Sequence, residues 1–396
     1  MKIAILIIVV LLGLATTGVA YLRYRMINTP DKKNLEATID TEVEKSMKGG
    51  LFPGIVVGVY KDGRTLIKGY GVINRNSSQR PDDETVFQIG SVSKVLTALL
   101  LQRLDDEGVV SIDATLGDLL GESMALSPSV HSVTLRQLVT HTSGFPRVPQ
   151  SLLNKVKEIA GEDDLMLDPY SHLGPSYVFD YLATAEGKTK GGRFDYSNYG
   201  MGLLAHVLEV VTGEDYESMV RDKVLHPLGM HHTAITLSSE LKDKLAQGYN
   251  AKGLPTRVWT FAALGGAGAY SSTAEDLTKF IQASVAENGL ASQLLLEMSK
   301  KQFNGDTGIG WMQPSFVDRF VGNQGVVWHN GMVGGYASYL SIDAESKSGV
   351  AILTNQASSL DMLGIMLTRQ IRTQSWSPNS SSIEANAADA KDRAAD

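Results

Sequence analysis

The chain has 396 residues, no cysteine, 43% hydrophobic and 20% charged residues, and a net charge of -7. This composition predicts a mainly globular protein with a large core, and it excludes disulfides, thiol catalysis and cysteine metal sites. The negative charge argues against a nucleic-acid partner, because the sequence has no basic stripe with interleaved aromatic residues.

The N-terminus is an apolar segment. Residues 3–22 carry no charge and lie between Lys2 and the sequence Arg23-Tyr24-Arg25. As a helix, this segment would span ~30 Å, the thickness of a bilayer core. We therefore expect residues 1–30 to hold a membrane anchor, with the rest of the chain exported to the periplasm or outside the cell. The alternative is secretion after cleavage of a signal peptide at Gly18-Val19-Ala20, although the apolar stretch exceeds the usual signal core of roughly 7–15 residues.

Both ends of the globular part predict strands next to helices. An amphipathic helix over 33–48 ends at Gly49-Gly50, and Lys61-Asp62-Gly63-Arg64 has the composition of a hairpin turn. The strands expected from apolar and β-branched runs cover 54–60, 65–72, 325–328, 336–342 and 349–354, and a closing helix covers 360–372.

The middle of the chain reads as mainly helical. A helix follows Ser91, and further helices are expected at 134–140, 198–212, 215–225 and 273–284. The stretch 147–192 mixes Pro, Gly and charge, which indicates an irregular insertion or lid. Strands at both ends with helices between them predict an α/β fold of the α+β type. Its antiparallel sheet is built from both chain ends, is flanked by helices, and has an inserted, mainly helical region. The domain would cover residues 31–374, and the polar tail 375–396 reads as disordered.

Ser91-Val92-Ser93-Lys94 opens a helix that is apolar nearly all round. The three-residue spacing puts Ser91 and Lys94 on one face of the first turn. A serine hydroxyl becomes a nucleophile when a neighbouring base takes its proton, and burial lowers the pKa of a lysine towards that role. Ser239-Glu240-Leu241-Lys242 matches the same pattern, but its charged surroundings indicate an exposed segment.

Two later segments carry polar side chains that are also candidates for a catalytic or binding site. In Phe194-Asp195-Tyr196-Ser197-Asn198, the tyrosine and asparagine point the same way if the loop is extended. In Val326 to Gly335, a strand with His329, Asn330 and Gly331 runs into a glycine-rich bend whose backbone N–H groups can face a ligand.

The ordered set Ser-Val-Ser-Lys, Tyr-Ser-Asn and His-Asn-Gly resembles the signature elements of the penicillin-recognising serine hydrolases. The Tyr-x-Asn form is that of class C β-lactamases and their relatives among D-alanyl-D-alanine carboxypeptidases, D-aminopeptidases and esterases. The resemblance extends over roughly 35–372 and includes the linking segments His141-Thr142-Ser143-Gly144, His226-Pro227-Leu228-Gly229-Met230, Gly265-Gly266-Ala267-Gly268, Ser272 to Leu277 and Gly308-Ile309-Gly310-Trp311.

The resemblance implies a role for each matching residue. Ser91 would form an acyl-enzyme, and Lys94 and Tyr196 would share the work of the base, with Tyr196 then activating water. Asn198 would bind substrate and orient Lys94. The substrate would also contact the third segment, His329 to Gly331. The backbone N–H groups of Ser91 and Met332 would form the oxyanion hole. No cofactor and no metal are implied.

His329 and Asn330 depart from the Lys-Thr-Gly form of the third element. A lysine is a permanent cation for a substrate carboxylate, whereas a histidine is mostly neutral at pH 7. In the family that this sequence resembles, the His-x-Gly form occurs in carboxypeptidases, aminopeptidases and esterases more than in efficient β-lactamases. The resemblance therefore implies an esterase or carboxypeptidase acting on esters or D-amino-acid amide and peptide bonds. The first alternative is a β-lactamase, and the second is a non-catalytic penicillin-binding module tethered to the membrane.

Each candidate residue also has a purely structural interpretation. Ser91 could cap a helix, Tyr196 could pack in the core, and His329 could sit at a strand end without a chemical role. His141 reads as a structural residue of its loop. His231 and His232 read as exposed loop histidines, since no zinc-ligand pattern such as His-Glu-x-x-His accompanies them. No Gly-x-Ser-x-Gly is present, which argues against an α/β-hydrolase.

Overall fold

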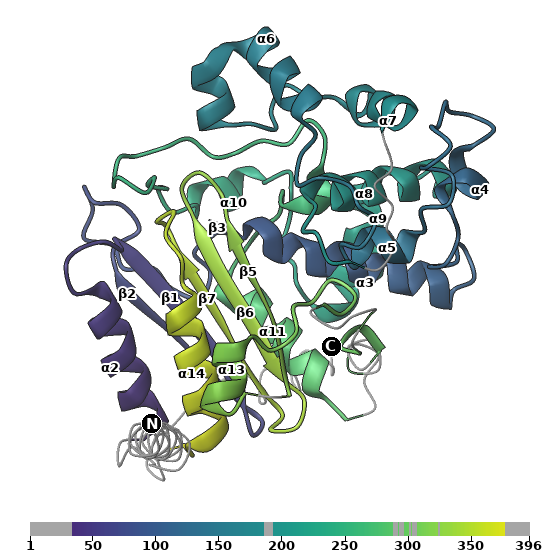
Figure 1. The fold of residues 1–396 in the computed structure, drawn as a ribbon. Coiled ribbons are helices and arrows are strands. Elements are labelled where there is room, and N and C mark those ends of the chain that lie inside the picture. Colours follow the sequence, from purple (N-terminus) through teal and green to yellow (C-terminus); the bar gives the residue numbers. More distant parts are fainter. Residues whose placement is uncertain are drawn as a thin grey trace, which may run out of the picture.

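The chain folds around a five-stranded antiparallel sheet with the strand order β2-β1-β7-β6-β5. The structure is a computed structural model that describes residues 34–185, 193–287, 292, 297–300, 302, 307–323 and 325–376. Figure 1 shows the five strands side by side in this order, from β2 at one edge to β5 at the other. Its strands are β1 (Gly54–Lys61), β2 (Arg64–Gly71), β5 (Val326–Met332), β6 (Ala337–Asp343) and β7 (Ser348–Thr354).

Strands from the two chain ends meet at the centre of the sheet. β1 pairs antiparallel with β7, in register from Ile55 opposite Thr354 to Lys61 opposite Ser348. β1 also pairs with β2 through a two-residue turn in which Asp62 and Gly63 both have positive φ, at 51° and 78°. Such turns match the right-handed twist of the strands. The predicted antiparallel sheet built from both termini is therefore confirmed.

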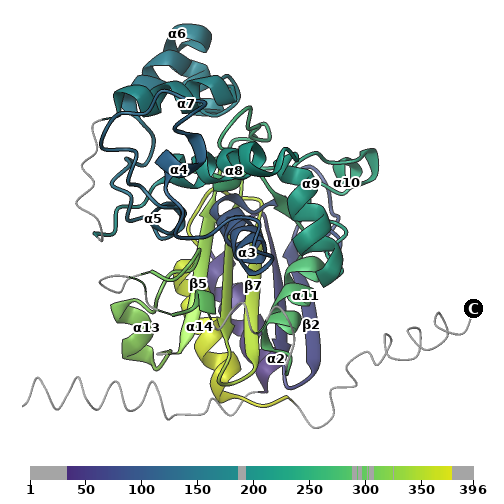
Figure 2. The same ribbon diagram turned by 90° about the vertical axis from the view of Figure 1, so that its right-hand side faces the viewer.

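Helices cover both faces of this sheet (Figure 2). Alternate residues of β1 separate the two faces: Ile55 and Val57 pack with α2 (Leu35–Met47) and α14 (Asp361–Thr373), while Val56 belongs to the larger core on the other side. That larger core includes α3 (Ser93–Asp106), α8 (Asn198–Thr212) and α11 (Ala274–Val285). The period-2 alternation of a strand buried on both sides produces this three-layer arrangement.

The helical region lies beyond one end of the sheet, with α6 and α7 at its far side (Figure 1). The remaining described helices and short strands are α4 (Leu116–Leu120), α5 (Leu135–Val139), α6 (Gln150–Leu167), α7 (Pro175–Thr184), α9 (Tyr216–Val220), α10 (Ser239–Asp243), α13 (Phe316–Val321), β3 (Phe87–Gln88) and β4 (Ser271–Ser272). Short 3-10 turns are η1 (Gly90–Val92), η3 (His226–Leu228) and η4 (Gly265–Ala267), and η2 (Arg221–Leu225) is a π-helical turn.

Two expectations about these elements were wrong, and a third is confirmed with a change of helix type. The insertion 147–192 is mainly helical in its described part, where it forms α6 and α7. The buried residues Leu152 and Val156, four positions apart, pack α6 against the core. Gly161 (φ 86°) kinks this helix. The helix expected at 215–225 becomes a π-helical turn after Val220. β5 continues beyond Trp328 through the His-Asn-Gly segment, because its pairing with β6 extends to Met332.

Parts of two predictions lie outside the described residues: the anchor or signal segment within residues 1–30, and the tail from residue 377. Among the described residues, no helix combines the length and apolar character that crossing a membrane requires. Trp376, expected in the disordered tail, instead packs beside α14 and β1, where its Nε1 donates to the carbonyl of Lys61 at 3.0 Å.

Candidate active site

Ser91 and Lys94 lie side by side at the start of α3. Ser91 is in the 3-10 turn η1 and is partly exposed, whereas Lys94 follows in the first turn of α3 and is fully buried. The Lys94 Nζ is 3.0 Å from the Ser91 Oγ. The structure thus places an accessible hydroxyl against a desolvated amine, as the spacing in the sequence predicts.

Lys94 has two further partners, both of which can only accept. Its Nζ donates to Asn198 Oδ1 at 2.9 Å and to the carbonyl of Ala267 at 2.6 Å. Burial lowers the pKa of Lys94 well below its usual value, and the charge of Arg147 lowers it further. A neutral amine has two N–H groups and one lone pair, so these two acceptors leave the lone pair facing the Ser91 hydroxyl.

The glycine-rich segment 265–268 positions the carbonyl of Ala267. The neighbouring carbonyl of Gly266 accepts from the Thr97 hydroxyl at 2.8 Å. A Cβ on Gly266 would lie 2.7 Å from the backbone oxygen of Met201, so only glycine allows α8 to approach this closely. The contact between Ala267 and Lys94 was not predicted, because a backbone carbonyl leaves no residue-type signal; the paired glycines were the available clue.

Tyr196 lies between the side chains of Lys94 and Arg147. Its ring centroid is 4.9 Å from the Lys94 Nζ and 5.2 Å from the Arg147 Cζ. Burial raises the pKa of Tyr196 to about 12, against the lowering effects of a hydrogen bond with the Ser91 side chain and of the Arg147 charge. Ser197 is extended, so Tyr196 and Asn198 face the same way, as expected. Tyr196 therefore holds its proton at neutral pH.

His141 holds residues 195–197 in place through hydrogen bonds and a ring contact, in agreement with its structural interpretation. Its Nδ1 accepts from the Ser197 N–H at 3.2 Å, and its carbonyl accepts from the Asp195 N–H at 2.7 Å. Its ring lies 4.5 Å from that of Tyr196. Burial lowers the pKa of His141 well below its usual value, so the ring is neutral and can accept this bond.

His329 is buried next to the same tyrosine, at 6.4 Å between ring centroids. Its Nδ1 is 2.7 Å from the carbonyl of Asn330, which can only accept, so Nδ1 carries a proton. Burial lowers the pKa of His329 to about 3. The third element therefore contributes a neutral group at pH 7.

The structure does not bring the Asn330 side chain to the site, which corrects the expected substrate contact. Asn330 Nδ2 donates to Asp361 Oδ1 at 2.9 Å, on the face covered by α14. Successive strand residues point to opposite faces, so His329 and Asn330 cannot both face Ser91. Gly331 is needed for close approach, since a Cβ there would lie 2.0 Å from the carbonyl oxygen of Ile89.

The backbone N–H of Met332 faces away from the sheet, towards the turn η1. The Val333 N–H donates to the carbonyl of Tyr336 at 3.0 Å, and antiparallel ladders alternate bonded and non-bonded pairs. The next pair, Met332 with Ala337, is then non-bonded. Because β5 is an edge strand, this N–H points outward, and a Cβ on Gly90 would lie 2.8 Å from its nitrogen. This geometry suits the expected oxyanion hole.

The rival Ser-x-x-Lys segment does not form such a site. Ser239 and Lys242 lie on the short helix α10, and both are exposed. Neither therefore has the desolvated environment that lowers the pKa of Lys94.

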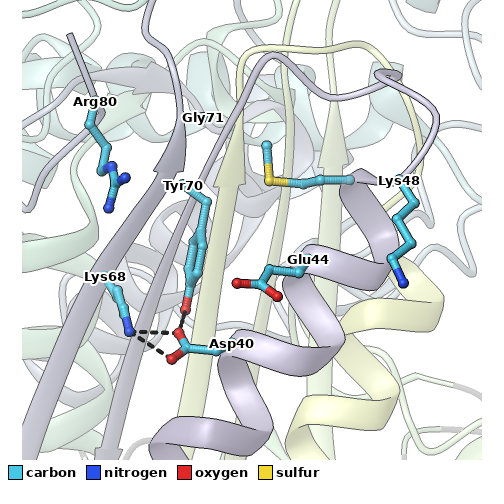
Figure 3. A pocket seen from close by; sticks show the side chains of 8 residues that line it. Asp40, Glu44, Lys48, Lys68, Tyr70, Gly71 and Arg80 are labelled. Carbon is cyan, nitrogen blue, oxygen red and sulfur yellow. Dashed lines mark hydrogen bonds and ion pairs between the residues drawn. The ribbon is translucent and has the colours of Figure 1, made fainter. Parts of the chain in front are cut away.

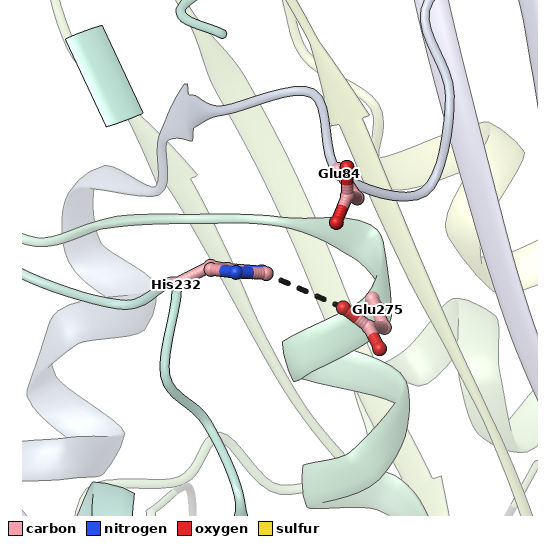
Figure 4. A group of neighbouring side chains, drawn as sticks. All are labelled: Glu84, His232 and Glu275. Carbon is pink, nitrogen blue, oxygen red and sulfur yellow. Dashed lines mark ion pairs between the residues drawn. The ribbon is translucent and has the colours of Figure 1, made fainter. Parts of the chain in front are cut away.

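His232 is more enclosed than a free loop histidine, which corrects part of that expectation. One ligand atom from each of Glu84, His232 and Glu275 lies within 4.8 Å of the others (Figure 4). Both carboxylates already have cationic partners, since Lys244 is 3.3 Å from Glu84 and Lys279 is 3.0 Å from Glu275. The group is therefore part of an ion-pair network, while His231 is exposed as predicted.

A surface pocket between α2 and β2 is separate from the site around Ser91 (Figure 3). In it, Asp40 accepts from the Tyr70 hydroxyl at 2.7 Å and pairs with Lys68 at 2.6 Å. β2 is the edge strand opposite β5, so this pocket and the His329 strand lie at opposite edges of the sheet.

Comparison with known sequences finds similarity along most of the domain. A family profile described as Beta-lactamase matches residues 39–372. The chain is 28% identical to Penicillin-binding protein 4 of Amycolatopsis lactamdurans over 328 residues, which covers 76% of this chain and 81% of that protein. It is 25% identical to the Beta-lactamase of Pseudomonas fluorescens over 363 residues, covering 82% and 94% of the two chains.

Solved structures share the fold. The Beta-Lactamase/D-Alanine Carboxypeptidase from Pseudomonas syringae superposes with a TM-score of 0.71 at 19% identity, covering 85% of this chain and 98% of that one. A class C beta-lactamase gives 0.72 at 23% identity, covering 87% and 97%. The predicted fold class is thereby confirmed.

The neutral state of buried His329 predicts a pH-dependent stability. Its pKa of about 3 in the folded protein lies below the unfolded value of ~6.5, so the unfolded chain binds more protons between these limits. Stability should fall as the pH drops through this window, by up to ~1.4 kcal/mol per pH unit from this residue. Urea unfolding at pH 7 and pH 5 measures the loss.

The His329→Gln variant should lose less stability than the wild type between these two pH values, by roughly 2 kcal/mol. His231→Gln, a change at an exposed histidine, is the control and should behave as the wild type does. Equal losses in the wild type and in His329→Gln would contradict a neutral, buried His329.

Proposed function

Because the chain belongs to the beta-lactamase family of serine hydrolases, we propose that it cleaves ester or D-amino-acid amide and peptide bonds through an acyl-enzyme on Ser91. The observation that carries the proposal is the environment of Lys94. Its buried Nζ is 3.0 Å from the Ser91 Oγ and has acceptors for both N–H groups in Asn198 and Ala267. Such an amine is a base directed at one hydroxyl.

In the acylation step, the Lys94 amine takes the Ser91 proton while the Oγ bonds to the substrate carbonyl carbon. The negative charge on the carbonyl oxygen is received by the backbone N–H groups of Ser91 and Met332. The Tyr196 phenol, hydrogen-bonded to the Ser91 side chain, gives its proton to the leaving alcohol or amine as the carbon–oxygen or carbon–nitrogen bond breaks. The Lys94 ammonium then returns a proton to Tyr196.

Deacylation uses the same groups in the opposite direction. Water attacks the acyl carbon, and its proton passes through Tyr196 to the Lys94 amine. The Ser91 Oγ leaves and takes a proton from the Lys94 ammonium, which restores the starting state. In this scheme Lys94 is the base and Tyr196 is the relay. The raised pKa of Tyr196 and the lowered pKa of Lys94 support that division.

Two features of the site bear on the substrate. Buried His329 is neutral at pH 7, so the third element offers no fixed cation for a carboxylate, and this favours esters. Arg147 is exposed beside Tyr196 and is a cation within reach of a bound acid, which keeps D-amino-acid peptides in the proposal.

A β-lactamase is the second candidate, and it is favoured by relatives that carry this name. The neutral His329 ranks it below the esterase. A non-catalytic penicillin-binding module ranks lowest, because Lys94 contacts the side chains of Ser91, Tyr196 and Asn198.

We also propose that residues 3–22 anchor the protein in a membrane, with the hydrolase exported. The proposal rests on the uncharged segment and its basic flanks. A cleaved signal peptide is the alternative.

Substituting the nucleophile is the first test. Ser91→Ala should lower the turnover of p-nitrophenyl butyrate by ~10³-fold or more, because no other hydroxyl is placed against a neutral amine in the described site. Ser239→Ala, which alters the rival motif, is the matched control and should retain wild-type turnover. Unchanged hydrolysis by Ser91→Ala would refute the acyl-enzyme on this residue.

A substrate panel tests the ranking of activities. We expect kcat/KM for p-nitrophenyl butyrate to exceed that for nitrocefin by about ten- to hundredfold, the worth of one charge-assisted hydrogen bond of roughly 1.5–3 kcal/mol. A D-alanyl-D-alanine peptide measured in parallel distinguishes an esterase from a carboxypeptidase. A higher kcat/KM for nitrocefin than for the ester would reverse the ranking.

Fractionation of cells that express the full chain tests the anchor. The protein should remain in carbonate-washed membranes, with a mass that includes residues 3–22. A washed-off protein whose N-terminus lies just after Ala20 would identify a signal peptide instead.

A further inference from the structure

Tyr170, in the segment between α6 and α7, makes a contact that the mechanism above does not use. Its hydroxyl accepts from Asn198 Nδ2 at 3.0 Å. The other end of the same amide, Oδ1, accepts from Lys94 at 2.9 Å. The amide of Asn198 therefore bridges the inserted helical region and the amine that faces Ser91.

The Tyr170 ring is held from two sides by aromatic residues. It stacks on Phe261 with ring centroids 4.9 Å apart and an interplanar angle of 11°, and Trp259 meets it edge-on at 5.7 Å. These rings belong to the segment before the glycine-rich turn η4. Trp259 is itself fixed to β3 by two hydrogen bonds with the side chain of Gln88, at 2.8 and 3.0 Å.

Backbone and carboxylate contacts join the same two segments. Ala262 donates to the carbonyl of Tyr170 at 3.1 Å. The backbone N–H and the hydroxyl of Thr260 both donate to Asp168 Oδ2, at 2.9 Å each. The buried Asp168 thus ties the segment 259–262 to the residues that carry Tyr170. The position of the phenol is therefore set by contacts on its ring and on its backbone.

The orientation of the Asn198 amide decides whether Lys94 can act as a base. An amide offers one acceptor and one pair of donors, and a flip would turn the NH₂ group towards the N–H groups of Lys94. Lys94 would then lose an acceptor, and its lone pair would be drawn from Ser91 to the amide. In the observed orientation, Nδ2 donates to the Tyr170 oxygen and Oδ1 accepts from Lys94, so the hydroxyl of Tyr170 supplies one of the two hydrogen bonds that hold the amide in place.

We propose that Tyr170 is a positioning residue for hydrolysis, whose hydroxyl fixes the amide of Asn198 and, through it, the amine of Lys94. This inference rests on the proposed acyl-enzyme mechanism. It gives the inserted region a function in the chemistry. The phenol itself touches neither Ser91 nor the transferred proton.

Tyr170→Phe tests the hydroxyl alone, because the ring and its stacking on Phe261 remain. We expect kcat/KM for p-nitrophenyl butyrate to fall about five- to tenfold through kcat, with KM and the melting temperature nearly unchanged. Tyr181→Phe, on α7 of the same inserted region, is the matched control and should keep wild-type kinetics.

A double-mutant cycle separates positioning from packing. In an Asn198→Ala background, Tyr170→Phe should have no further effect, because the amide through which it acts is gone. Where turnover of these variants is too slow, the second-order rate of Ser91 labelling by a fluorophosphonate replaces it. The same fold loss in both backgrounds, or no loss in the wild-type background, would overturn the assignment.

The Ser91→Ala variant distinguishes a failure of the proposed function from a failure of the inference about Tyr170. If Ser91→Ala retains turnover, the proposed function itself fails. If Ser91→Ala is inactive and Tyr170→Phe matches the wild type, only the role of Tyr170 fails.

Discussion

Removing one amine from water is the constraint on which the rest of the site depends. Lys94 is fully buried, and an isolated buried ammonium would be costly, so burial lowers its pKa and favours the neutral form. Its two N–H groups need acceptors, and these are supplied by Asn198 on α8 and Ala267 in η4. Three elements must therefore converge at one nitrogen before Ser91 has a base. The large apolar core around α3 provides the desolvation, and the polar contacts provide the direction.

The sheet contributes through the geometry of its edge strand. β5 carries His329 on the face towards Tyr196 and Asn330 on the face towards α14, and the alternation of its hydrogen bonds turns the N–H of Met332 outward. Gly331 lets this strand approach the backbone before Ser91. Tyr170 of the inserted region contacts Asn198, whose side chain accepts from Lys94. Acid, base and oxyanion groups thus come from a helix start, a loop and a strand edge held by one core.

Much of the fold could be predicted from local patterns. The strands at both ends, the Asp62-Gly63 turn and helices α2, α8, α11 and α14 follow from periodicity and turn chemistry, and family membership confirms the resemblance drawn from the three ordered motifs. The errors have physical causes. The Pro, Gly and charge of 147–192 concealed α6 and α7, and Trp376 was assigned to the tail because its partner, the carbonyl of Lys61, lies 315 positions away. Asn330 was placed in the site because a motif does not state which face of a strand a residue occupies.

The sequence by itself determined the chemical groups and their order: a serine and a lysine one turn apart, a tyrosine two residues before an asparagine, and a histidine in place of a permanent cation. Only the tertiary structure decided their charge states and partners. Lys94 meets its two acceptors 104 and 173 positions along the chain, and the pKa values of Lys94, Tyr196 and His329 are shifted chiefly by burial. Burial is a property of the packed core. Local spacing can place two side chains on one face of a helix, but only the fold removes the water around them.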